Sequence, residues 1–136
     1  MKSSLLYPTW PLMQNKWIPS IVLDRSHWNT DNFLLYDQSG FMPTLVQVVH
    51  RNLAYLIVVF IMVFCYRWIK SQNSQLHWVS YVLVGGVVLQ VLMGIFVLLG
   101  SLGSIPVLYG VIHQGIGILF LTYLFYLIIR ANNNYI

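Results

Sequence analysis

Three long apolar runs dominate the pattern of hydrophobic and polar positions, over residues 45–69, 78–99 and 107–129. Each run is close to the roughly 20 residues that an α-helix needs to span the hydrocarbon core of a bilayer. The pattern therefore predicts an all-α integral membrane protein, a helical bundle with three transmembrane helices.

Residues 1–43 differ in kind from the rest of the chain. They hold four of the five prolines and all three carboxylates, and their aromatic residues are of the kinds that gather at membrane–water interfaces. We expect a non-spanning interfacial segment here. Too few apolar residues separate Lys2 from Pro8 for the hydrophobic region of a signal peptide, so no cleaved leader is expected. The interfacial aromatic residues of this segment are Tyr7, Trp10, Trp17, Trp28 and Tyr36, and its carboxylates are Asp24, Asp31 and Asp37.

The distribution of Lys and Arg predicts the orientation. Arg67 and Lys70 follow the first run and Arg130 ends the third, whereas the 100–106 connection carries no charge. Cytoplasmic flanks of membrane helices hold an excess of Lys and Arg, so the 70–77 turn is expected in the cytoplasm and the 100–106 connection outside. The predicted organisation is an exoplasmic segment 1–43, a transmembrane region 44–130 and a cytoplasmic tail 131–136.

Composition excludes several classes of function. Charged residues make up 7% of the chain, where a soluble domain carries about 25%. The net charge of +4 comes from scattered residues, so no basic cluster is present to bind nucleic acid. The single Cys65 cannot form an intramolecular disulfide. Glutamate is absent and every aspartate precedes the first run, so no carboxylate base is expected in the membrane and no catalytic residue is assigned.

Two of the four histidines, His50 and His113, lie within the apolar runs. Ionisable residues inside a membrane are costly and are candidates for function. If Thr44, after Pro43, caps the first helix, His50 lies six residues into it, and His113 lies seven residues past Pro106. At about 1.5 Å per residue, both imidazoles then lie roughly 9–10 Å below the same surface.

Two histidines at one depth on two helices of the bundle can hold a metal centre between them. No cysteine or carboxylate is near, which disfavours a closed zinc site. Heme iron brings four nitrogens of its own and needs two axial ligands, so it fits the count, with His50 and His113 as the iron ligands. The sequence alone leaves a structural reading equally open, in which each histidine only hydrogen-bonds a neighbouring helix.

Residues beside the two histidines fit either reading. Gly110, Gly115 and Gly117 surround His113 and remove side chains where a flat macrocycle would approach, but glycine is also common where membrane helices touch. Arg51, next to His50, suits pairing with a heme propionate, or it extends to the lipid headgroups.

The second run contains Gln90, with Gly86 and Gly94 one turn to either side on the same face. This pattern predicts a packing stripe with one interhelical hydrogen bond. His27 and His77 flank the membrane and are expected to face solvent.

Four stretches of the chain form an ordered set of motifs. They are Thr9-Trp10-Pro11-Leu12-Met13 through Trp17-Ile18-Pro19; Val46-Gln47-Val48-Val49-His50-Arg51-Asn52-Leu53-Ala54-Tyr55; Leu89-Gln90-Val91-Leu92-Met93-Gly94-Ile95; and Val111-Ile112-His113-Gln114 with Leu119-Phe120. In this order they resemble the second half of heme A synthase, the membrane enzyme that oxidises heme O to heme A for terminal oxidases. In the first stretch Asn15 stands where the family commonly has glycine, a substitution that suits a left-handed turn position.

The resemblance implies a fold and a division of labour. The family has eight helices in two related halves, and this chain matches one loop and the last three helices. The family's second half holds a b-type heme on two histidines, which assigns His50 and His113 as axial ligands. Its first half is thought to house substrate oxidation and carries a glutamate.

The resemblance therefore implies an oxidoreductase of a bacterial plasma membrane that is inactive without its N-terminal half. The expected partners are the lipid bilayer, the heme, and either the complementary half or another copy of the chain. A stand-alone b-type cytochrome subunit for electron transfer and a degenerate membrane module without heme are the alternatives.

Reporter fusions test the predicted orientation. A topology reporter fused after Ser104 should report the exoplasmic side and one fused after Asn133 the cytoplasm, because one span, the apolar run 107–129, separates the two fusion sites. If both fusions report the same side, the three-helix arrangement is wrong.

Overall fold

A computed structural model describes residues 3–36 and 38–133 of the chain. Within this part every regular element is a helix, which confirms the all-α prediction. The short helices α1, α2, η1 and α3 precede the long helices α4, α5 and α6. Their bounds are α1 Ser3–Leu6, α2 Ser20–Leu23, η1 Arg25–His27, α3 Thr30–Leu34, α4 Phe41–Ile69, α5 Ser74–Leu99 and α6 Val107–Asn133.

The three long helices confirm the predicted membrane spans. Each is long and apolar enough to cross a bilayer by length and composition. Most of their large apolar side chains are exposed, and none of the spanning window of α6 is buried inside the protein. Apolar surface of this extent belongs in lipid or against another membrane helix, so the chain is an integral membrane protein.

Helix α4 begins earlier than expected. Gly40 precedes its first residue, Phe41, and supplies no side-chain cap. The prediction that Thr44 caps this helix is wrong: Thr44 lies inside α4, and its hydroxyl donates to the Gly40 carbonyl at 2.6 Å. Pro43 is accommodated because residues of the first helical turn have no intrahelical acceptor for their N–H. The predicted boundary between residues 43 and 44 therefore falls within a continuous helix.

The other helix ends also extend beyond the apolar runs. The side chain of Asn73 accepts from the backbone N–H of Gln75 at 3.0 Å and begins α5 four residues before the run at 78. Helix α6 continues to Asn133, so the first half of the predicted 131–136 tail is helical, and residues 134–136 lie outside the described residues.

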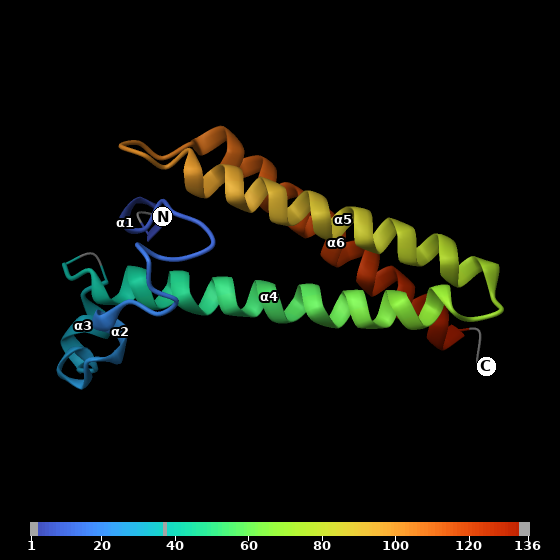
Figure 1. Cartoon of the computed structure of the whole chain (residues 1–136), viewed down its shortest axis with the longest axis horizontal. Coiled ribbons are helices and arrows are strands. Elements are labelled where there is room, and N and C mark those ends of the chain that lie inside the picture. The colour runs from blue at the N-terminus through green and yellow to red at the C-terminus, as the bar shows by residue number, and fades with distance from the viewer. Residues whose placement is uncertain (1–2, 37, 134–136) are drawn as a thin grey trace.

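The long helices form an open arrangement (Figure 1). Helices α5 and α6 run side by side in opposite directions, and α4 packs against α5. Helix α4 approaches α5 where it ends, which we call the narrow end, and diverges from α5 toward its beginning, the wide end. Toward the narrow end, Cys65 of α4 and Ser80 of α5 contact each other and are 1% and 0% exposed.

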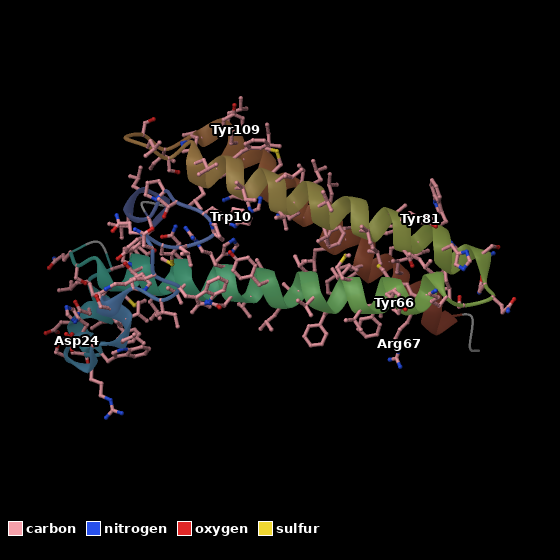
Figure 2. The ribbon with its side chains drawn as sticks, viewed as in Figure 1. Trp10, Asp24, Tyr66, Arg67, Tyr81 and Tyr109 are labelled. Carbon is pink, nitrogen blue, oxygen red and sulfur yellow. The ribbon has the colours of Figure 1, made fainter. Side chains whose placement is uncertain are left out.

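The N-terminal segment lies at the wide end, where α1 contacts both α4 and α5. In Figure 2, Trp10 and Tyr109 lie toward this end, whereas Tyr66, Arg67 and Tyr81 lie toward the other. The N-terminal segment and the start of α6 thus share one side of the bundle. This placement agrees with the expected common side of the segment and the 100–106 connection.

Glycines set the register between α5 and α6. Three of them each face a large side chain of the opposite helix, and an added Cβ would lie 2.7–3.2 Å from that side chain. Close approach through small residues is how helices associate in lipid. The predicted packing stripe on α5 is therefore confirmed. The pairs are Gly86 with Phe120, Gly117 with Gln90, and Gly94 with His113.

Replacing Gly86 with alanine should loosen this contact. The new Cβ would lie 2.7 Å from two ring atoms of Phe120, and overpacking of this kind costs about 1–3 kcal/mol of stability. Unfolding in mixed detergent micelles, followed by circular dichroism, measures the loss. Gly85→Ala is the matched control because nothing lies within 4 Å of an added Cβ there. Equal stability of the two variants would contradict the register.

Candidate functional site

The structure brings the two intramembrane histidines together. The ring centres of His50 on α4 and His113 on α6 are 6.4 Å apart, with an angle of 80° between the ring planes. The two helices themselves are not closely packed. Each packs mainly against α5, and α4 and α6 make few direct contacts with each other among the described residues. His50 is exposed and His113 partly buried. The expected pairing is confirmed, although α4 begins three residues before Thr44, from which the depth of His50 was counted. The role of the two histidines as ligands stays a prediction.

Helix α5 holds His113 in place. A Cβ at Gly94 would lie 3.2 Å from Cε1 of the His113 ring, so glycine is what admits the imidazole against α5. One turn away, Nε2 of Gln90 donates to the backbone carbonyl of His113 at 3.2 Å. The interhelical hydrogen bond predicted for Gln90 is confirmed, and its acceptor belongs to His113 itself.

The three glycines near His113 differ in what lies beside them. The space beside Gly117 is filled by the Gln90 amide, 2.9 Å from where a Cβ would lie, so it is not free for a macrocycle. Gly115 follows His113 by two residues and therefore projects to roughly the opposite face of α6. Gly110 has nothing within 4 Å of an added Cβ and leaves open space one turn from His113.

Arg51 binds the N-terminal segment. Its guanidinium donates to the carbonyl of Tyr7 at 2.9 Å and to that of Pro11 at 3.3 Å, and the residue is 9% exposed. Gln47, one turn earlier, donates to the same Tyr7 carbonyl at 3.2 Å. Arg51 therefore does not extend to the headgroups, which was one reading of the sequence. Among the described residues no carboxylate lies within 4.0 Å of it, so only carbonyl dipoles offset its charge.

A second contact fixes the segment beside the histidines. The ring of Trp17 stacks on Tyr55 of α4 with 5.4 Å between ring centres, and its Nε1 donates to Asn52 at 3.4 Å. Sequence reasoning missed Gln47 and Tyr55. The signal was their spacing of four residues to either side of Arg51, which places all three on one face of α4.

The turn inside the segment has the conformation expected from Asn15. Met13 and Lys16 pair as an isolated antiparallel bridge, with φ of 49° at Gln14 and 67° at Asn15. Asparagine tolerates this left-handed region better than most residues. The turn lets Met13 pack at 2% exposure against α4 through Val48.

The remaining histidines lie apart from the pair and do not simply face solvent. His27 Nδ1 is 3.4 Å from an Asp24 oxygen and its ring lies against Phe41. The Ser26 backbone N–H, donating to Asp24, lowers the pKa of that carboxyl. His77 Nε2 donates to the Ser71 carbonyl at 2.9 Å in the turn before α5. Across the described part of the chain, no three His, Cys, Asp or Glu residues gather as a metal cluster.

Fold and site together define a class: helical membrane proteins in which two spanning helices present facing histidines. Residues 1–125 match the model of the COX15-CtaA family, described as cytochrome oxidase assembly protein. The chain belongs to this family.

Individual relatives agree with the family match. The heme A synthase of Rickettsia rickettsii (strain Sheila Smith) is 28% identical over 123 residues, which cover 90% of this chain and 33% of that protein. The heme A synthase of Brucella anthropi is 32% identical over 124 residues, covering 90% of this chain and 32% of that protein. The chain thus spans about a third of the length of the curated relatives it matches. No solved structure matches it significantly.

Replacing Arg51 with methionine should release the N-terminal segment. The substitution removes the donors to Tyr7 and Pro11, and a lost buried hydrogen bond costs about 1–3 kcal/mol. Trypsin should then cleave after Lys16 and Arg25 about tenfold faster, because cleavage requires local opening of the segment. Arg67→Met, at the narrow end, is the control and should leave both rates unchanged. Equal rates in the Arg51 variant and the wild type would show that the segment is held by other contacts.

Proposed function

We propose that this chain is the heme-b-binding, C-terminal part of a heme A synthase, an oxidoreductase that oxidises the methyl group of heme O to give heme A for terminal oxidases. The observation that carries the proposal is the facing pair His50 and His113, 6.4 Å apart within a chain that belongs to this family. The span of about a third of the relatives' length supports assignment of the chain to one part of the enzyme.

The spacing of the two rings fits bis-histidine ligation of one iron. A metal–nitrogen bond of about 2 Å, with about 1 Å from the nitrogen to the ring centre, separates two axial imidazoles by about 6 Å between centres. The separation of 6.4 Å agrees with this value. The angle of 80° between the rings is compatible, because each ring can rotate about its metal–nitrogen bond without changing that separation.

Arg51 supplies a charge for a heme propionate. It follows His50 directly and is buried, and the two carbonyls it contacts leave part of its five donors unused. A buried guanidinium is stabilised when a negative charge lies beside it, and the planar carboxylate of a propionate matches the geometry of its donors. The Tyr55 hydroxyl, also buried and without a hydrogen-bond partner, lies one turn further along α4.

His50 and His113 would hold the heme, which would then supply one-electron transfer. The residues of this chain position the group: Gly94 and Gln90 fix the His113 ring against α5, and the Arg51 contacts hold the N-terminal segment beside His50. No residue of this chain is assigned a catalytic role. Substrate oxidation belongs to the complementary half.

The exposed surfaces support a partner at this site. His50 is exposed, and none of the spanning window of α6 is buried. The partner proposed to cover them is the complementary N-terminal half or another copy of this chain. In this arrangement the N-terminal segment faces the exoplasmic side of a bacterial plasma membrane and the C-terminus faces the cytoplasm.

Heme spectra of single variants test the ligand assignment. His50→Ala and His113→Ala should each abolish the six-coordinate, low-spin spectrum of the purified protein or convert it to a five-coordinate one, because each removes one axial ligand. His77→Ala is the control, because the His77 ring hydrogen-bonds the Ser71 carbonyl in the turn before α5 and lies apart from the histidine pair. Wild-type spectra in both single variants would refute the assignment and leave the two residues as packing histidines.

Heme A production tests the division of labour. In a host that makes heme O but lacks its own heme A synthase, this chain alone should yield no heme A, because it has no glutamate and no aspartate beyond residue 37 to manage protons in the membrane. Co-expression with the N-terminal half of the Rickettsia rickettsii relative should restore production. Heme A formed by the chain alone would contradict the proposal. A heme spectrum without heme A in the presence of the partner half would favour an electron-transfer cytochrome instead.

A further inference from the structure

Two buried polar atoms without hydrogen-bond partners lie on the facing surfaces of α5 and α6. They are Oε1 of Gln90 and Nδ1 of His113. A buried polar atom left unpaired costs about 1–3 kcal/mol, and such atoms are few in folded proteins. Oε1 can only accept a hydrogen bond, whereas Nδ1 donates when it carries the imidazole proton. The two atoms are therefore chemically complementary in one of the two tautomers of His113.

Two contacts bring the Gln90 side chain and His113 to the same place between α5 and α6. Nε2 of Gln90 donates to the His113 carbonyl at 3.2 Å. Because a carbonyl only accepts, the amide nitrogen must face it, which fixes which end of the amide carries Oε1. The ring of His113 lies on Gly94, one turn from Gln90 on the same face of α5. The terminal torsion of glutamine is broad, so the position of Oε1 can adjust by rotation of the amide.

We propose that Gln90 is a positioning residue for His113. Its amide nitrogen binds the His113 carbonyl, and its amide oxygen accepts the proton of His113 Nδ1. This second bond holds the neutral imidazole in the tautomer whose Nε2 is unprotonated and free to ligate a metal. The ligand role of Nε2 rests on the proposed function, whereas the hydrogen bond to Nδ1 does not.

The position of the ring in the fold agrees with this assignment. Nδ1, but not Nε2, is among the fully buried polar atoms without a partner, so Nδ1 is the more enclosed nitrogen. His50 approaches the same ring from α4. Metal-bound histidines commonly donate their second N–H to a protein acceptor, which fixes the tautomer and raises the basicity of the ligating nitrogen.

The first experiment tests the hydrogen bond in the protein without heme. The protein labelled with ¹⁵N-histidine is examined by NMR in detergent micelles, where the ring nitrogen shifts report the tautomer. The wild type should show His113 protonated at Nδ1, and Gln90→Leu should shift it toward the Nε2–H form. The resonances of His50, His27 and His77 are internal controls. An unchanged His113 tautomer in Gln90→Leu overturns the proposal.

The second experiment measures the heme midpoint potential. Loss of the acceptor in Gln90→Leu lowers ligand basicity and weakens ferric heme binding, by about tenfold if it follows other second-sphere residues. If only the binding of ferric heme is weakened tenfold and the binding of ferrous heme is unchanged, the one-electron midpoint potential rises by about 59 mV. Gln90→Glu keeps an acceptor, a stronger one, and should lower the potential. Gln114→Leu, an exposed glutamine next to His113, is the matched control and should leave it unchanged.

The two variants separate positioning from packing. If Gln90 had only a structural role, Gln90→Leu and Gln90→Glu would both lower stability, and the heme midpoint potential would not shift in opposite directions in the two variants. That result overturns the proposal. If Gln90→Leu does not fold, Gln90→Glu still tests the direction of the shift, and an unchanged potential there counts against it. Absence of heme from the wild type would refute the proposed function instead, while the tautomer measurement would still decide the hydrogen bond.

Discussion

The close approach of α5 and α6 through glycine is the constraint on which the rest of the structure depends. Lipid tails are as apolar as leucine, so two membrane helices gain little from burying apolar side chains and associate through tight packing and hydrogen bonds instead. Here Gly86, Gly94 and Gly117 remove the side chains that would separate the helices. The resulting register sets the depth and the rotation of His113, and it places the Gln90 amide on the backbone of that histidine.

Helix α4 is positioned by a different principle. It has no comparable contact with α6, and its place is set by the buried Cys65 and Ser80 toward the narrow end and by the N-terminal segment at the wide end. The second of these restraints depends on a buried charge: Arg51 reaches backbone carbonyls about 40 residues away in sequence. The separation of the two histidine rings therefore depends on how a polar loop is held as much as on helix packing.

The features predicted from sequence were those that depend on local pattern. Apolar length predicted the three spans, matched depth predicted that His50 and His113 meet, and helical spacing predicted the Gln90 stripe. The rest depends on tertiary contacts that no local pattern encodes. The loop carbonyls that bind Arg51 and the side chain that fills the space at Gly117 come from distant parts of the chain, and α4 passes through Pro43 without a side-chain cap.

The short 100–106 connection helps α6 to stay paired with α5 although the contacts between the two helices are few. Because α6 is tied directly to the end of α5, the pairing of the two helices is an intramolecular association with a high effective concentration. A modest set of glycine contacts can then hold α6 in register while its outer faces stay free. The connection thus keeps α6 paired with α5 although the two helices share only a small contact surface. The rest of the α6 surface stays available for contact with other helices.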